Sequence, residues 1–101
     1  MPNIKFSYLY RDGANYKNYN SVIFDDSNNV DLAELETLIR SKLIDGTWFY
    51  VNKWNLPDLR TDSFNYERDP TWHEFETVEY THEICNTQLD LQELSDTIKK
   101  T

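Results

Sequence analysis

The chain has 101 residues, of which 18 are acidic and 10 are basic, so its formal net charge at pH 7 is −8. This acidity excludes ordinary nucleic-acid binding and docking on an anionic membrane, because both surfaces attract Lys and Arg. Hydrophobic residues at 39% and aromatic residues at 15% are typical of a folded protein. We therefore expect a single domain spanning residues 1–101 whose favoured partner is a basic protein.

The N-terminal quarter of the chain has the pattern of a β-hairpin. Large apolar side chains occupy alternate positions at Ile4, Phe6, Tyr8 and Tyr10. A period of two predicts a strand with one aromatic face turned inward. Residues 12–20 follow as a loop rich in Asn and Tyr, and residues 21–25 form a second short strand. Two neighbouring strands joined in this way predict an antiparallel pair.

The first helix has clear start and stop signals. Asp31 is the expected N-cap, and Glu34 lies three residues on, which is the spacing of a capping box. Leucines and Ile39 then recur at helical spacing and predict one apolar face. Gly46 is expected to end the helix as a C′ glycine.

Two further strands are expected in the middle of the chain, separated by an irregular segment at residues 57–70. Residues 47–51 are rich in aromatic and β-branched types, which favour a strand. Residues 71–84 predict a longer strand whose apolar phase slips near Phe75. We expect a β-bulge near Glu76 and Thr77 for that reason.

The second helix begins like the first. Leu89-Asp90-Leu91-Gln92-Glu93-Leu94 matches Val30-Asp31-Leu32-Ala33-Glu34-Leu35, which is consistent with an internal ββα repeat. Capping boxes are common and the match is short, so two unrelated helices are the simpler explanation. Either reading predicts an α+β, two-layer fold: a mainly antiparallel sheet of about four strands, in the order ββαββα, with two helices on one face.

Metal sites are weakly indicated. Residues 25–36 place oxygen donors at calcium-loop spacing, but Val30 occupies the position that needs glycine. His82 and Cys85, with His73, are zinc-ligand types, yet the two histidines are nine residues apart on a predicted strand. We expect no metal, no cofactor and no catalytic residue. The single cysteine excludes an internal disulfide, and with no signal-peptide pattern the expected location is cytoplasmic.

Aromatic and acidic residues concentrate in the segment from Trp48 to Glu83. Aromatic side chains supply contact area and carboxylates select a basic partner. The main hypothesis is therefore a non-enzymatic binding module of the kind found among immunity proteins, antitoxins and inhibitors. Its predicted contact residues are Trp54, Asp58, Asp62, Tyr66, Trp72, Glu74 and Glu76.

Two alternatives stay open. The polar loop after the first strand offers bases, amides and tyrosines, so a small ligand-binding domain or enzyme is the second hypothesis. Its pocket would use Tyr10, Arg11, Asn15, Tyr16, Lys17 and His73, with Glu74. The third reading is association through the sheet edge at residues 71–83, although alternating glutamates discourage such pairing. A monomer or weak homodimer is expected.

Three strings of the sequence carry a resemblance. The segments 6–17 (FSYLYRDGANYK), 43–46 (LIDG) and 72–76 (WHEFE) are similar to those of a family of small, acidic, uncharacterised bacterial proteins. The resemblance implies a bacterial, cytosolic origin. It brings no established activity and no site residue with it.

Overall fold

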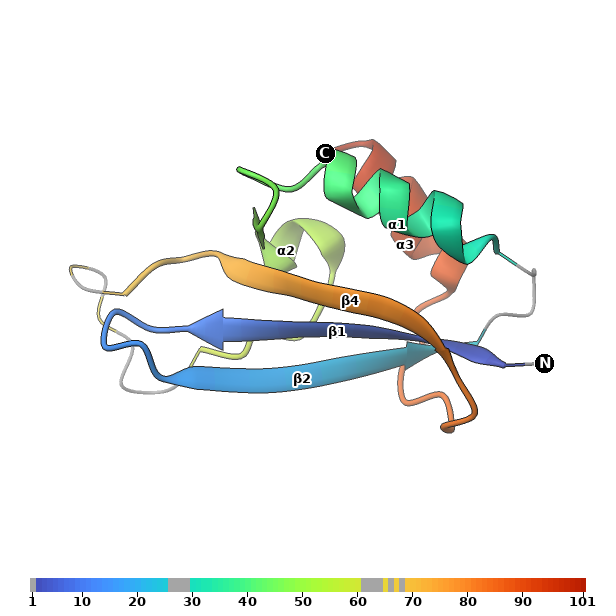
Figure 1. The fold of residues 1–101 in the computed structure, drawn as a ribbon, viewed down its shortest axis with the longest axis horizontal. Coiled ribbons are helices and arrows are strands. Elements are labelled where there is room, and N and C mark those ends of the chain that lie inside the picture. The colour runs from blue at the N-terminus through green and yellow to red at the C-terminus, as the bar shows by residue number, and fades with distance from the viewer. Residues whose placement is uncertain (1, 26–29, 61–64, 66, 68) are drawn as a thin grey trace.

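A computed structural model describes residues 2–25, 30–60, 65, 67 and 69–101. Its strands are β1 (Asn3–Arg11), β2 (Lys17–Phe24), β3 (Trp48–Phe49) and β4 (His73–Thr81), and its helices are α1 (Leu32–Ser41), α2 (Val51–Trp54) and α3 (Leu91–Lys99). The sheet order is β2-β1-β4-β3, and all neighbouring strands are antiparallel. Figure 1 shows the helices on one side of the sheet. The predicted α+β class, with helices against an antiparallel sheet, is confirmed.

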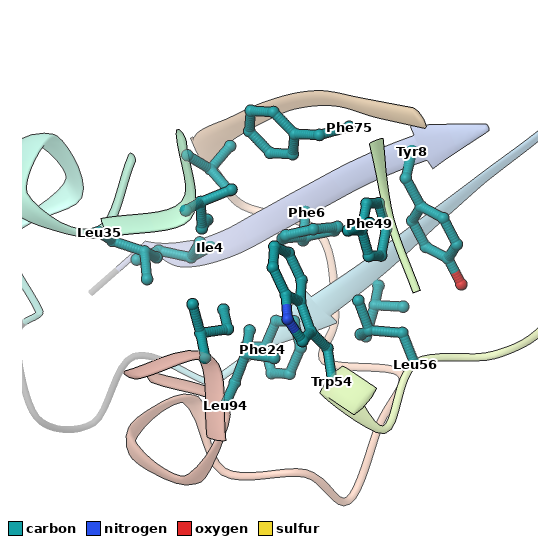
Figure 2. Close-up of a cluster of buried hydrophobic side chains, with 14 of the residues drawn as sticks. Ile4, Phe6, Tyr8, Phe24, Leu35, Phe49, Trp54, Leu56, Phe75 and Leu94 are labelled. Atoms are coloured by element: carbon teal, nitrogen blue, oxygen red, sulfur yellow. The ribbon is translucent and has the colours of Figure 1, made fainter. Parts of the chain in front are cut away.

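β1 is central in the sheet, and its alternation places one row of side chains in the core. Ile4, Phe6 and Tyr8 have no exposed surface. They face residues from all three helices and from β4 (Figure 2). We call this the inner face of the sheet, and the opposite side the outer face. The predicted aromatic strand therefore contributes three fully buried side chains to the protein interior.

The expected bulge lies in β4. Ser7 pairs with Thr77 while the next residue, Tyr8, pairs with Phe75, so Glu76 has no opposing residue in β1. The extra residue lets Phe75 and Val78 enter the core although they are three positions apart. Glu76 itself is exposed. β4 is shorter than predicted, because it ends at Thr81 rather than near residue 84.

The first hairpin has a tighter connection than the sequence suggested. β2 begins at Lys17, so residues 17–20 of the predicted loop at residues 12–20 belong to a strand. The Asp12 carboxylate accepts hydrogen bonds from the amides of Ala14 and Tyr16, both at 2.9 Å. Asn15 takes a left-handed conformation with φ of 69°. The Asp12 hydrogen bonds and the left-handed Asn15 together reverse the chain direction within residues 12–16.

The helix starts are as predicted, and the first helix end is not. Asp31 accepts a hydrogen bond from the Glu34 amide at 3.1 Å, and Asp90 accepts one from the Gln92 amide at 2.8 Å. α1 ends at Ser41 with Lys42 as its C-cap. Gly46 comes too late to be the C′ residue. Its φ of +71° instead serves the turn that leads into β3.

The predicted strand at residues 47–51 is only partly a strand. Trp48 and Phe49 pair with β4, but Val51 begins the one-turn helix α2. Positions i and i+3 of a helix share one side, so this turn places both Val51 and Trp54 in the core. Figure 2 shows Trp54 beside Phe49 and Phe6. A longer strand would have turned one of the two outward.

Candidate functional site

The long connection from α2 to β4 is anchored to the inner face by polar groups of the sheet. The Tyr8 hydroxyl donates to the Pro57 carbonyl at 2.6 Å, and the Tyr10 hydroxyl donates to the Pro70 carbonyl at 2.7 Å. Both tyrosine side chains are otherwise buried. Two ends of an irregular segment are thereby fixed to neighbouring positions of one rigid strand.

Asp69 is the buried anchor of the same connection. It is 6% exposed, and its two carboxylate oxygens accept from the amides of Gly13 at 2.8 Å and Asn65 at 2.9 Å. One side chain therefore joins the hairpin turn to the connection. A carboxylate that accepts backbone hydrogen bonds makes the stronger, charge-assisted kind.

Replacing Asp69 with alanine is expected to lower the free energy of unfolding by about 1–3 kcal/mol, because two amides lose their acceptor. Urea denaturation of the purified chain measures this change. Glu67→Ala is the matched control, since it removes an exposed carboxylate from the same connection and should change stability by less than about 0.5 kcal/mol. Equal effects of the two substitutions would contradict the anchoring role of Asp69.

His73 lies inside this anchored region and not in a pocket. It has no exposed surface, and its ring lies 5.0 Å from that of Tyr10 and 6.0 Å from that of Tyr8, between centroids. Its Nε2 accepts the Leu59 amide at 3.0 Å. The proton of the neutral ring is therefore on Nδ1, which has no hydrogen-bond partner in the described part of the chain.

Burial lowers the pKa of His73 to about 4, against the opposing effect of the Asp58 carboxylate. The neutral ring thus acts as an acceptor that holds the connection. The predicted ligand pocket includes this histidine, and the burial of its ring against Tyr8 and Tyr10 contradicts that part of the prediction. Aromatic rings and the backbone of the connection occupy the place that a ligand would need.

The remaining residues of the predicted ligand set separate into three groups. Arg11 pairs with Glu74 through Nε and Oε2 at 2.8 Å, and its Nη1 donates to Asn15 Oδ1 at 2.6 Å. Tyr16 and Lys17 are exposed at the hairpin turn. Tyr10 is buried, and the Pro70 carbonyl accepts its hydroxyl hydrogen. These groups do not converge on one empty space.

The predicted partner-contact set is also divided by the structure. Trp54 is 2% exposed and stacks on Phe49 with 4.5 Å between ring centroids, so its place in the contact set is wrong. Asp58 forms an ion pair with Arg60 at 2.6 Å, and this partner lowers the pKa of Asp58. Asp62 and Tyr66 lie outside the described residues. Within the described part of this set, Asp58, Trp72 and Glu76 keep exposed surface, whereas Glu74 is partly buried and paired with Arg11.

Trp72 and Glu74 belong to a row of side chains that crosses the outer face. The pairing register places Trp48 opposite Glu74, Glu74 opposite Leu9, and Leu9 opposite Tyr19. Opposed residues project to the same face of a sheet, so the row runs across all four strands. Trp72 packs against Trp48 with 5.5 Å between ring centroids. We call these five residues, with Arg11, the outer-face row.

Aromatic surface remains accessible at both ends of the outer-face row. Tyr19 is 58% exposed at the β2 end, and Trp72 is 37% exposed at the β3 end. Sequence reasoning missed Trp48 and Tyr19 as surface candidates. The sequence does contain one signal. Leu9 alternates with the inward-facing Ile4, Phe6 and Tyr8, so it lies on the outer face, and strand pairing then places its partners on that face too.

No protein-family model, no curated protein and no solved structure matches this chain. The bacterial family suggested by its sequence strings therefore stays a prediction. Among the described residues, no helix has the length and apolarity needed to cross a membrane. Within the same ranges, no group of three or more His, Cys, Asp or Glu side chains is placed to hold a metal ion.

Proposed function

We propose that this chain is a non-enzymatic protein-binding module that engages a basic partner through the outer face of its sheet. The observation that carries the proposal is the outer-face row, which presents exposed aromatic side chains at both of its ends. Aromatic rings of this kind act as anchors of protein interfaces because they bury much apolar area with few rotatable bonds. An immunity protein, antitoxin or inhibitor would use such a surface.

The charges around the row support a basic partner. Arg11 is paired with Glu74, and Lys5 is paired with Glu83 at 2.8 Å. These pairs neutralise the two basic side chains of β1. Glu76 and Glu79 are exposed on the neighbouring strand, and the whole chain carries a net charge of −8. Long-range attraction would therefore speed the encounter with a basic protein, and salt would weaken it.

The proposal is tested by affinity capture from a lysate of the source organism, with the salt concentration raised in steps. We expect a basic protein to be retained at low ionic strength and released as the Debye length falls below about 5 Å. Trp72→Ala and Glu76→Lys should each reduce the retained amount. The matched control is Glu93→Lys on α3, which changes the net charge equally away from the row.

Two results would overturn the proposal. The first is a failure to retain any basic protein at low salt. The second is an equal loss with Glu76→Lys and Glu93→Lys, because that would show a response to net charge alone and not to this surface.

A further inference from the structure

We infer that the free edge of β4 receives an extended, basic segment of the partner as an added antiparallel or parallel strand, with residues Val78–Thr81 as the template. This inference rests on the proposed function and names how the partner is held. β3 pairs only with His73 and Glu74, so within the described residues the second half of β4 has a neighbouring strand on one side only. Figure 1 shows this half of β4 passing below α1.

At this edge, backbone N–H and C=O groups of β4 point away from the sheet. Ser7 pairs with Ser21 on one side and with Thr77 on the other. The Ser21 carbonyl faces away from β1, because it accepts from the Asn86 side chain at 3.4 Å. Alternation then directs the backbone of Ser7 toward β4 and that of Thr77 toward β1.

By the same alternation, the N–H and C=O groups of Val78 and Tyr80 point away from the sheet. The other end of β4 confirms the phase, since the Phe75 amide donates outward to the Thr47 carbonyl at 3.0 Å. Phe75 and Val78 are three positions apart, and the extra residue Glu76 between them lets the backbone groups of both point away from β1. Two N–H donors and two carbonyls are thus oriented for a further strand, which is the requirement for recognition by strand addition.

A hollow beside this edge would receive alternate side chains of the added strand. Its volume is about 620 Å³, and it is lined by Val30, Asp31, Leu32, Ala33, Glu36 and Tyr80. Tyr80 pairs with Ile4, so its ring projects from the inner face of the sheet, yet it is 51% exposed. A partner residue opposite Tyr80 would project to the same side and place an apolar side chain between Tyr80 and α1.

The next residues of the added strand would project to the outer face, next to Glu79. Directly opposed side chains in a sheet have their Cβ atoms about 4.5–5.5 Å apart, so a Lys or Arg at that position would meet the carboxylate. The matching sequence alternates apolar and basic residues. Such a segment adds backbone hydrogen bonds, apolar contact and charge pairing at a single edge.

The same charges argue against a second copy of this chain as the occupant. Two β4 edges paired about a twofold axis would bring Glu76 and Glu79 of one chain near the same residues of the other. Like charges across a strand pair are destabilising, and exposed charges are a common means by which proteins prevent edge-to-edge association. The edge therefore discriminates against self-pairing and in favour of a basic segment.

The test uses a fluorescein-labelled peptide of about seven alternating Val and Lys residues, close to the usual strand length. We expect saturable binding and slower hydrogen exchange at the amides of Val78 and Tyr80. Tyr80→Pro removes one outward donor and should weaken binding about tenfold or more. Ser21→Pro is the matched control, because the Ser21 backbone occupies the equivalent outward phase on the edge strand β2 and lies outside the outer-face row.

A second measurement does not depend on the folding of a variant. The same peptide, N-methylated at alternate residues, should bind the unaltered protein about tenfold more weakly when its methylated amides are those facing Val78 and Tyr80. A peptide with Glu in place of Lys should not bind measurably. Equal binding of the Lys and Glu peptides, or protection confined to the β2 edge, would overturn the inference.

The two proposals fail in different ways. If a basic protein is captured but binds Tyr80→Pro as well as the unaltered chain, the edge inference is wrong and the proposed function stands. If neither the Val–Lys peptide nor any basic protein binds at low salt, both are wrong.

Discussion

Replacing Trp54 with alanine is expected to lower the free energy of unfolding by about 3–5 kcal/mol. The side chain is 2% exposed, stacks on Phe49 at an interplanar angle of 17°, and meets Phe6 edge-on with 6.3 Å between centroids. Its removal leaves a cavity lined by rings that the surrounding strands hold in place. The indole Nε1 also donates to Thr101 Oγ1 at 3.3 Å, so the C-terminus loses a contact.

Equilibrium denaturation in urea measures the loss, with Trp72→Ala as the matched control. Trp72 is 37% exposed and packs against the Trp48 ring, so its substitution should cost about 1 kcal/mol or less. In a binding assay the order should reverse: Trp72→Ala weakens partner capture, whereas the folded fraction of Trp54→Ala retains it. A Trp54→Ala variant as stable as the unaltered protein would show that this indole is not part of the core.

Trp54 also shows where sequence reasoning fails for this chain. Trp54 lies between the predicted strand at residues 47–51 and the irregular segment at residues 57–70, and the sequence gives no sign of a helix there because one turn is too short for a periodic signal. Its two apolar positions, Val51 and Trp54, look like isolated residues in the sequence. Only the tertiary contacts of Phe49 and Phe6 show that they complete the core.

The parts predicted well are those with local causes. Asp31 and Asp90 cap their helices because a side-chain oxygen three or fewer residues away satisfies an amide that the helix leaves free. The bulge at Glu76 follows from the mismatch between Phe75 and Val78 in a period-two pattern. Both inferences need only a few adjacent residues and no knowledge of what the segment packs against.

The candidate site was predicted less well, because its residues meet through strand pairing. Trp48 and Tyr19 are 29 positions apart in the sequence, from 19 to 48, and the register that aligns them through Leu9 and Glu74 involves all four strands. Similarly, His73 resembles a surface histidine until the connection from α2 covers it. Nothing in its neighbours, Trp72 and Glu74, which lie on the opposite face, indicates burial.

The burial of His73 has a measurable consequence for stability. Between pH 6.5 and about 4, the free energy of unfolding is expected to fall by about 3 kcal/mol through this residue alone. In the unfolded chain the imidazole takes up a proton near its ordinary pKa of about 6.5. In the folded protein it stays neutral until about pH 4. The unfolded state therefore binds more protons within this window, and stability is full above it and lost as the pH falls through it.

The ring resists protonation because its Nε2 is buried between the connection and the sheet. A proton on Nε2 would displace the Leu59 amide that it accepts at 3.0 Å and would place a charge among the rings of Tyr8, Tyr10 and Phe49. Asp58 Oδ1, at 3.5 Å, is the nearby carboxylate that opposes this cost. Asp58→Asn should therefore lower the pKa of His73 further and extend the loss of stability to lower pH.

Urea denaturation at steps between pH 4 and 7 measures the effect, together with the NMR titration of the His73 ring. His73→Gln keeps a hydrogen-bond acceptor but has no titrating group. Its free energy of unfolding should therefore change less steeply with pH, and the two slopes should differ by up to about 1.4 kcal/mol per pH unit. The other carboxylates of the chain titrate in both proteins and cancel in the difference. Parallel stability curves for the two proteins, or a ring that titrates near pH 6.5 in the folded state, would contradict the burial of His73. A steeper fall of stability with falling pH in the unaltered chain would show that the neutral His73 ring stabilises the folded protein. That ring accepts the Leu59 amide and so attaches the connection that carries Trp72 to the outer face.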